Sequence, residues 1–394
     1  MSDHPVLRPT RLAALELRNR VVKTATFEGM TPGGIPSDDL IEYHRRLAEG
    51  GVALTTVAYC AVAADGRTFS QQMYMRAEVQ PQLTRLADAV HAEGGAVSIQ
   101  LGHCGGFSKN LQMWPRRPKG PSPSVNQYGA LSGMPLAGSM SLALIERTTA
   151  DFAAAAARAR DTGIDAVELH LGHGYLLSQF LSPLSNRRRD HYGGSLENRL
   201  RFPLEVVRAV REQVGRDYPV ICKVNLEDGA RGGLEIEEAV EVARALEREG
   251  VDALVLSGGF VARNGFYMLR GDAPIASMVE VEKNPLQKIT LRWMGERVIR
   301  ALPFTEMFFL EGSRRVREAV QMPLMLMGGI VSSANMQQAM DEGFDLVAVG
   351  RALIADPDFV RRVERGEAPV SDCNHCNECV AEMDRGGIRC VLRD

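Results

Sequence analysis

Residues 167–202 read VELHLGHGYLLSQFLSPLSNRRRDHYGGSLENRLRF and contain a strand, a loop and the start of a helix. Residues 167–171 are an apolar run typical of a short buried strand. His170, His173 and Tyr175 lie where this run gives way to a glycine-containing loop. Ligands of parallel α/β folds bind beyond the carboxyl ends of the strands. The stretch therefore predicts one strand–loop–helix unit with a ligand site at the end of its strand.

Seven more apolar runs of similar length occur along the chain, and stretches with the 3.6-residue period of helices separate them. The expected strands are residues 20–26, 53–59, 96–101, 166–171, 220–225, 253–258, 324–329 and 346–351. The clearest expected helices are residues 149–162, 195–214, 235–249 and 332–342. Ser332 is the expected N-cap of the last helix, and Gly343 is its expected stop. This alternation predicts repeated right-handed βαβ units.

Eight such units favour an α/β fold of the (β/α)8, or TIM, barrel type. An open doubly wound sheet would carry G-x-G-x-x-G after its first strand, and residues 24–31 lack it. The connections at 102–145 and 259–322, after the third and sixth strands, are long and rich in glycine, proline and aromatic residues. We expect both to cover a substrate, with insertions away from the site as the alternative. We expect a barrel domain at 1–365 and a cysteine-rich extension at 366–394.

The composition is that of an ordinary soluble globular protein, with 45% hydrophobic and 24% charged residues. The formal net charge of −3 gives no reason to expect a nucleic-acid or membrane partner. The first ten residues lack the apolar core of a signal peptide, and no apolar run approaches the length of a transmembrane helix. We therefore expect a cytoplasmic protein.

Glycines and charged residues at strand ends indicate a ligand with a phosphate group. Gly328-Gly329 and Gly350-Arg351 end the seventh and eighth strands, where barrels commonly bind phosphate. Tight turns without a ligand are the alternative interpretation. Lys223 lies inside a buried strand, which is costly unless the charge is paired or functional. A structural salt bridge is the alternative to a ligand contact there.

The motifs E-x-H-x-x-H-G-Y, Q-F-L-S-P-x-x-N and Y-G-G-S-x-E-N-R-x-R-F occur in this order within 167–202. The segment resembles the signature of the old yellow enzyme family of FMN-dependent NAD(P)H oxidoreductases. That family is related to the barrel domains of 2,4-dienoyl-CoA reductase and trimethylamine dehydrogenase. Residues 328–330 (GGI) and 349–359 (VGRALIADPDF) are similar to the family's FMN-phosphate segments. The resemblance covers about residues 5–365 and implies FMN as cofactor and NAD(P)H as reductant.

The resemblance also implies FMN contacts at the ends of several strands. Gln100 matches the glutamine that hydrogen-bonds the pyrimidine ring of the flavin. Lys223 occupies the position of the basic residue that stabilises the anionic reduced flavin. The complete implied set is Ala25, Thr26, Ala58, Gln100, His170, Lys223, Gly328, Gly329, Gly350 and Arg351. Two positions depart from the family: Phe27 cannot donate the usual hydrogen bond to flavin O4, and residues 103–106 (HCGG) lack the usual arginine.

His170 and His173 match the family's pair that hydrogen-bonds the carbonyl oxygen of an activated alkene. Two such donors stabilise the negative charge that develops as hydride arrives from flavin N5. Tyr175 lies in the position of the tyrosine that protonates the α-carbon, a general-acid step. Histidines satisfied inside a polar core are the alternative interpretation. A zinc site at the two histidines lacks a third ligand in the sequence.

Cys373, Cys376, Cys379 and Cys390 crowd near the end of the chain with the spacing C-x2-C-x2-C-x10-C. Four thiolates at this density suit an iron–sulfur cluster or a zinc ion. The larger barrel relatives carry a similar cysteine group for a [4Fe–4S] cluster. Cysteines that hold no metal are the alternative, and His375 is a further candidate ligand.

The leading hypothesis is an FMN-dependent NAD(P)H oxidoreductase that reduces an electron-poor, α,β-unsaturated carbonyl-type alkene. One alternative is an amine or demethylating dehydrogenase that passes electrons to FMN and a C-terminal metal cluster. The other is a non-catalytic redox relay subunit. We expect a small-molecule alkene and NAD(P)H as ligands and a homo-oligomeric assembly. The sequence specifies neither the physiological substrate nor a preference between NADH and NADPH.

Overall fold

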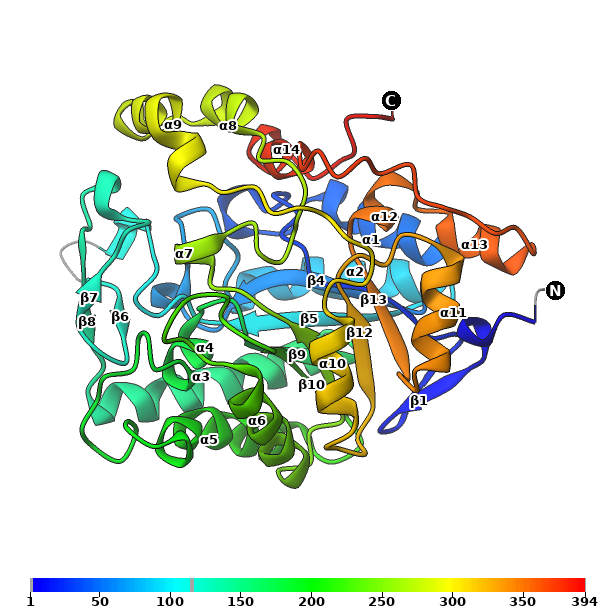
Figure 1. Cartoon of the computed structure of the whole chain (residues 1–394). Coiled ribbons are helices and arrows are strands. Elements are labelled where there is room, and N and C mark those ends of the chain that lie inside the picture. Colours follow the sequence, from blue (N-terminus) through cyan, green and yellow to red (C-terminus); the bar gives the residue numbers. More distant parts are fainter. Residues whose placement is uncertain (1–2, 114–116, 394) are drawn as a thin grey trace.

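Eight parallel strands form a closed barrel in the computed structural model, which describes residues 3–113 and 117–393 (Figure 1). They are β3 (Val21–Lys23), β4 (Leu54–Ala61), β5 (Ala96–Gly102), β9 (Ala166–Leu171), β10 (Val220–Asn225), β11 (Ala253–Ser257), β12 (Leu324–Met327) and β13 (Leu346–Val349). They follow one another around the barrel in chain order, and β13 pairs with β3 to close it. The eight predicted strands and the (β/α)8 barrel are therefore confirmed.

Helices follow every barrel strand and cover the outside of the barrel (Figure 1). Their bounds are α1 (Asp38–Glu49), α2 (Gln80–Ala92), α3 (Leu142–Asp161), α4 (Leu176–Leu181), α5 (Leu196–Val214), α6 (Ile236–Arg248), α10 (Leu310–Arg317), α11 (Ser333–Asp341), α12 (Arg351–Ala355) and α13 (Phe359–Glu364). The helix predicted at 149–162 begins earlier, because the Ser141 hydroxyl accepts a hydrogen bond from the Leu144 amide and caps α3 there. The predicted cap Ser332 is present and forms a capping box with Asn335.

The core has an outer layer between strands and helices and an inner layer within the barrel, because side chains alternate between the two faces of a strand. Leu169 of β9, for example, belongs to the outer layer. A hairpin of β1 (Thr10–Leu12) and β2 (Leu15–Leu17) lies against the inner layer. Leu12 and Leu17 of this hairpin pack on residues at the starts of the barrel strands. They fill the amino-terminal end of the barrel.

The two long connections fold into small units of their own. The first forms a three-stranded sheet of β6 (Lys119–Gly120), β8 (Leu136–Ser139) and β7 (Ser124–Val125). The second carries α7 (Val261–Asn264), α8 (Ile275–Val281) and α9 (Pro285–Val298). In Figure 1 the sheet and α9 project on the same side of the barrel.

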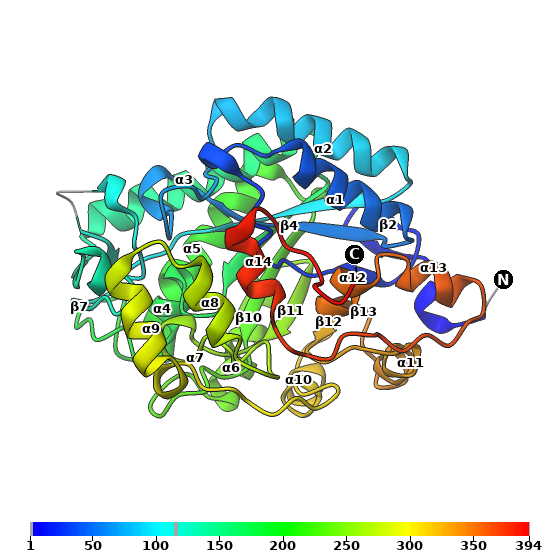
Figure 2. The same ribbon diagram turned by 90° about the horizontal axis from the view of Figure 1, so that it is seen from above.

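The cysteine-rich tail follows α13 and returns across the barrel. Its helix α14 (Cys379–Arg385) packs against α8, and Figure 2 shows it running over the middle of the molecule. The Ile388 amide donates a hydrogen bond of 2.7 Å to the carbonyl of Glu28, in the loop after the first barrel strand. The tail is thus attached to the carboxyl-terminal end of the barrel. None of the helices in the described ranges is long and apolar enough to span a lipid bilayer.

Candidate active site

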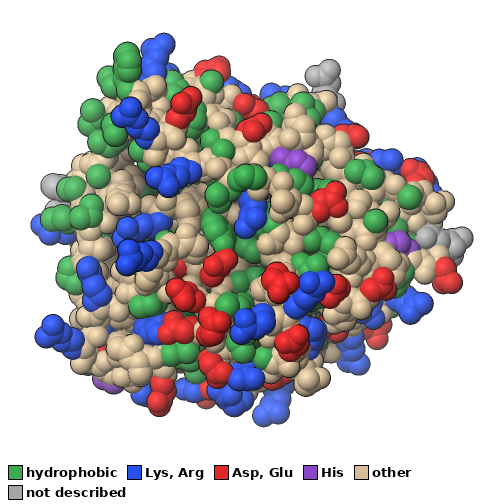
Figure 3. Space-filling view, viewed as in Figure 1, with side chains coloured by type: hydrophobic (Ala, Val, Ile, Leu, Met, Phe, Trp, Pro, Cys, Tyr) green, Lys and Arg blue, Asp and Glu red, His purple; other side chains and the backbone are tan. Residues whose placement is uncertain are grey.

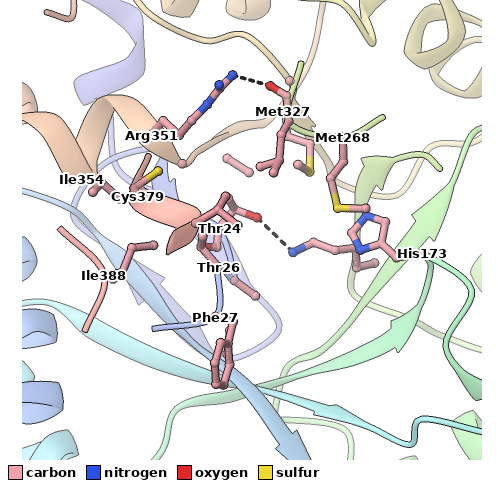
Figure 4. Close-up of a pocket in the computed structure, with 18 of the residues that line it drawn as sticks. Thr24, Thr26, Phe27, His173, Met268, Met327, Arg351, Ile354, Cys379 and Ile388 are labelled. Carbon is pink, nitrogen blue, oxygen red and sulfur yellow. Dashed lines mark hydrogen bonds between the residues drawn. The ribbon is translucent and has the colours of Figure 1, made fainter. Parts of the chain in front are cut away.

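A cavity of about 310 Å³ lies at the carboxyl ends of the barrel strands (Figure 4). The sequence-predicted residues that line it are Ala25, Thr26, Ala58, Gln100, His170, His173, Tyr175, Lys223, Gly328, Gly329, Gly350 and Arg351. The structure thus brings together every non-cysteine residue that the sequence assigns to the site. The second long connection adds Met268, Phe304 and Phe308 to the wall, and the tail adds Cys379. The connection at 259–322 therefore covers this cavity, as predicted.

Lys223 is paired and also lines the cavity. Its Nζ lies 3.0 Å from Glu168 Oε1 and 3.0 Å from Thr24 Oγ1, and Figure 4 shows the contact to Thr24. Gln100 Nε2 donates a hydrogen bond of 2.6 Å to the same Glu168 oxygen. Among the described residues nothing donates to the Gln100 side-chain oxygen, so it can accept from a ligand. Lys223 can therefore form a salt bridge and also contact a ligand, so the two interpretations of this residue are compatible.

His170 and His173 are buried neighbours with ring centroids 5.0 Å apart. Burial lowers the pKa of His170 well below its ordinary value and that of His173 to about 3, so both rings are neutral at pH 7. His173 Nε2 lies 2.7 Å from the Ser257 hydroxyl, and its backbone amide donates to Asn225 Oδ1 at 2.9 Å. Nδ1 of His170 is fully buried and has no partner among the described groups. The accessible ring nitrogens are thus Nε2 of His170 and Nδ1 of His173.

Tyr175 is the N-cap of α4 and lies beside both His170 and Tyr59, with ring centroids 4.7 and 4.8 Å away. Burial raises the pKa of the Tyr175 phenol above its ordinary value, so the hydroxyl keeps its proton at neutral pH. Phe107 from the first long connection packs its ring edge against Tyr175, with a centroid distance of 6.0 Å. The phenol is therefore held in an aromatic cluster at the edge of the cavity.

Glycines and one arginine form the end of the cavity near β12 and β13. Gly329 has φ +78°, and a Cβ there would lie 2.7 Å from the carbonyl oxygen of Thr305, so only glycine fits. Arg351 donates hydrogen bonds to the carbonyls of Leu269 and Arg270 and to Asn377 Oδ1. Figure 4 shows one of these bonds. Burial lowers the pKa of Arg351, and its described hydrogen-bond partners are all neutral oxygens.

The four C-terminal cysteines do not assemble into a metal site in this structure. Within residues 3–113 and 117–393, no three His, Cys, Asp or Glu side chains are placed to hold a metal ion. Cys379 lines the cavity, and burial raises the pKa of its thiol to about 12. His375, the further candidate ligand, stacks on Phe304 with ring centroids 3.4 Å apart. The geometry therefore gives the metal prediction no support.

Glu168 was not predicted from the sequence, but it contacts two of the predicted cavity residues, Lys223 and Gln100. Glu168 and His170 are two positions apart on β9 and share its inner face, so period-two alternation was the signal. A buried ion pair beside the cavity was not predicted either, with Lys23 Nζ 3.0 Å from Glu28 Oε1. That Glu28 oxygen also accepts from the amide of Ala58, a cavity residue, at 3.2 Å. The only signal for this pair was a lysine inside an apolar run.

Comparisons with known proteins agree with this architecture. Residues 5–263 and 281–369 match the NADH:flavin oxidoreductase / NADH oxidase family. The chain is 42% identical over 390 residues to 4,4'-dithiodibutanoate disulfide reductase of Rhodococcus erythropolis, covering 99% of this chain and 95% of that protein. It is 32% identical to the multifunctional alkene reductase/demethylase OYE of Caballeronia cordobensis, covering 93% of this chain and 50% of that protein.

Among solved structures, morphinone reductase superposes with a TM-score of 0.72 at 25% identity, covering 95% of this chain and 93% of that one. The resemblance to the old yellow enzyme family is therefore confirmed. The chain spans nearly all of the Rhodococcus protein but only half of the Caballeronia protein. Because the family match and the Rhodococcus match each cover most of the chain, the chain belongs to the NADH:flavin oxidoreductase / NADH oxidase family.

Proposed function

We propose that this protein uses FMN and NAD(P)H to reduce electron-poor alkenes such as α,β-unsaturated carbonyl compounds. The observation that carries the proposal is the convergence of His170, His173, Tyr175, Lys223 and Gln100 on one cavity. The set combines two hydrogen-bond donors, one proton donor and the polar contacts that a flavin ring requires. NAD(P)H and the alkene would use the same open face of the flavin in turn.

The residues around the cavity fit FMN by their own chemistry. Arg351 is a half-buried cation without a described carboxylate partner, and a phosphate would supply its counter-charge. Lys223 would stabilise a negative charge on the flavin ring, and Gln100 would accept a hydrogen bond from a ring N–H. Bound FMN, once reduced by NAD(P)H, would supply the hydride from its N5.

His170 and His173 would hold the carbonyl oxygen of the alkene. A neutral imidazole carries one N–H, so the tautomer decides which nitrogen donates. If the Ser257 hydroxyl donates to His173 Nε2, the proton of that ring is on Nδ1, its accessible nitrogen. Donors positioned in advance stabilise the negative charge that develops on the oxygen during hydride transfer.

Tyr175 would complete the reduction by protonating the α-carbon of the alkene. A general acid must be protonated at the working pH, and burial ensures this for Tyr175. The 4.7 Å between the ring centroids of Tyr175 and His170 supports this role, because the phenol would then lie close to the proposed carbonyl site.

Anaerobic spectroscopy tests the proposal. We expect the purified protein to be yellow, to release FMN on acid treatment and to bleach on addition of NADPH or NADH. Addition of 2-cyclohexenone without oxygen should then restore the oxidised spectrum. Release of FAD, or a reduced spectrum that the enone leaves unchanged, would overturn the proposal. Amine oxidation and electron relay receive no separate support from the cavity.

Disulfide reduction is a second candidate, favoured by the 42% identity to the Rhodococcus disulfide reductase over almost the whole of both chains. The balanced reaction would convert NADH, a proton and one disulfide into NAD⁺ and two thiols. Parallel assays with 4,4'-dithiodibutanoate and 2-cyclohexenone, scored by thiol release and alkene loss, compare the two candidates directly.

A metal bound by Cys373, Cys376, Cys379 and Cys390 is a separate proposal that rests on their spacing alone. The arrangement of their side chains does not fit a bound metal, and the chemistry proposed above uses none. Iron, sulfide and zinc contents of anaerobically purified protein, compared with those of a Cys373→Ser variant, test it.

A further inference from the structure

A second cavity of about 330 Å³ adjoins the one described above. It lies between the small sheet, the loop after α4 and helix α7. Its polar wall consists of Ser122, Ser124, Asn126, Gln127, Gln179 and Ser185. Arg187 and Arg263 also line it, whereas none of the described lining residues is Asp or Glu. The cavity is therefore positively charged.

Neither arginine is neutralised by the described part of the chain. Arg187 Nη2 donates to the carbonyl of Pro123 at 2.7 Å, and its backbone amide donates to Ser122 Oγ at 2.9 Å. These bonds hold Arg187 against the small sheet, and its other guanidinium N–H groups have no hydrogen-bond partner among the described residues. The Arg263 side chain has neither a hydrogen bond nor an ion pair within residues 3–113 and 117–393, and it is exposed. In Figure 3, Lys and Arg side chains gather on the side where Figure 1 draws the small sheet and α9.

The second cavity is built onto the turn that carries His173 and Tyr175. The Val261 amide, at the start of α7, donates to the His173 carbonyl at 2.9 Å. The Phe260 ring packs so closely on Gly174 that a Cβ there would lie 2.5 Å from it. Gln179, which lines the second cavity, donates to the Gly174 carbonyl at 2.7 Å. The cationic cavity and the proposed alkene site therefore share a wall.

We propose that this second cavity binds an anionic group of the substrate, so that the protein selects electron-poor acceptors that carry a carboxylate away from the reacting bond. The proposal rests on the proposed function, because it assigns the reacting end of the substrate to His170, His173 and Tyr175. Guanidinium groups pair with carboxylates through two parallel hydrogen bonds. Two arginines that form no ion pair with the described residues, in a cavity whose described lining contains no Asp or Glu, suit that chemistry. The phosphates of NADPH are the other source of such an anion, and the experiment separates the two.

The test compares a carboxylate with its neutral ester. The probes are 4-(2-nitroethenyl)benzoate, its methyl ester and unsubstituted β-nitrostyrene, each reduced by the FMN-loaded enzyme. We expect the kcat/KM of the wild type to be at least about fivefold higher for the carboxylate than for the ester, because the KM for the carboxylate is lower. This preference should fall in 0.5 M salt, which screens the charges. Arg263→Gln and Arg187→Gln should each reduce the preference, and the double variant should abolish it. Arg263→Lys, which keeps the charge, should retain part of it.

Arg189→Gln is the matched control, because Arg189 is an exposed arginine in the same loop as Arg187 but lines neither cavity. It should leave the preference unchanged. A binding measurement without turnover completes the design. Calorimetric titration with the saturated product 4-(2-nitroethyl)benzoate should show tighter binding than its ester in the wild type and equal binding in the double variant.

The outcomes separate this inference from the proposed function. If the wild type does not reduce β-nitrostyrene, the proposed function fails, while the calorimetric comparison still decides the anion site. If the wild type treats carboxylate and ester alike in both assays, the anion site is refuted while alkene reduction stands. If the double variant slows flavin reduction by NADPH but not by NADH and keeps the carboxylate preference, the arginines serve the reductant and the inference is overturned.

Discussion

Lys223 and Glu168 form an ion pair of 3.0 Å inside the barrel, with side chains only 1% and 3% exposed. A buried pair of this kind has two effects that substitutions can separate. Removal of either partner leaves the other charge buried and uncompensated, which typically costs about 3–5 kcal/mol of stability. The cation also lines the cavity, so its removal changes the electrostatic potential that a bound flavin experiences.

Lys223→Met should therefore lower both the stability of the fold and the midpoint potential of the bound FMN. We expect the potential to fall by about 30 mV or more, since 30 mV corresponds to about 1.4 kcal/mol for a two-electron couple. The double variant Lys223→Met/Glu168→Gln should regain stability, and it should regain part of the potential because a negative charge is removed as well. Dye-equilibration potentiometry and urea unfolding measure the two effects. An unchanged potential in both variants would show that Lys223 is only structural.

His170→Ala and His173→Ala should each slow alkene reduction by about 10², the usual cost of one positioned donor. FMN content should stay near that of the wild type, because other residues carry most of the proposed flavin contacts. His191→Ala, an exposed histidine outside the cavity, is the control. Reduction of 2-cyclohexenone at the wild-type rate by the double histidine variant would refute the assignment of this pair.

Tyr175→Phe should separate the two half-reactions. Flavin reduction by NAD(P)H needs no proton on an alkene carbon and should stay nearly unchanged. The alkene half-reaction should slow by about 10²–10⁴, the usual contribution of a general acid. Nitroalkenes should be affected less than enones, because their nitronate product is stable before protonation. Stopped-flow spectroscopy measures both steps, and equal slowing of the two would argue against the donor role.

The buried neutral His173 should make the protein less stable in mild acid. Its pKa is lowered by burial to about 3, whereas an unfolded histidine titrates near its ordinary value of about 6.5. Below that pH the unfolded chain binds a proton that the folded chain does not, so stability falls as pH decreases from about 6.5 toward 3. Between pH 7.5 and 5.5 the loss from this group is about 1.4 kcal/mol. Chemical denaturation at several pH values measures this loss. The His173→Asn variant should not show it, whereas the His191→Asn variant should.

Asn377 should control how long a cofactor stays in the cavity. It is buried in the tail, accepts a hydrogen bond of 2.5 Å from Arg351 and donates one of 2.8 Å to the Asp272 carbonyl. Asn377→Ala should therefore increase the dissociation rate of FMN several-fold, with little change in the unfolding midpoint of the barrel. Fluorescence of the released flavin after dilution measures the rate. Asn374→Ala, a neighbouring tail position outside the cavity lining, is the control.

Local sequence signals predicted the barrel well, because each strand is a compact apolar run that only a doubly covered sheet can bury. The same runs located the ends of the strands, and the polar residues there, such as Gln100 and Lys223, meet in one cavity. Period-two alternation within a run was the signal that could have added Glu168, which pairs with both.

The docking of the tail could not be predicted, because it depends on contacts between residues far apart in the chain. The bonds from Ile388 to Glu28 and from Arg351 to Asn377 leave no local pattern in the sequence. The second cavity could not be predicted from the sequence either, because Arg187 and Arg263 come from different connections. The cysteine spacing suggested a metal, but a spacing does not fix where the side chains point.

Because α14 lies over the barrel, its position affects when a cofactor can enter during protein synthesis. All eight barrel strands precede α14 in the sequence, so they leave the ribosome before the helix that lies across the end of the barrel. A cofactor that arrives at this stage enters an uncovered barrel, and the helix then closes over it. Flavin added later to the finished apoprotein meets the closed form, so loading in the cell should be faster than reconstitution in the test tube.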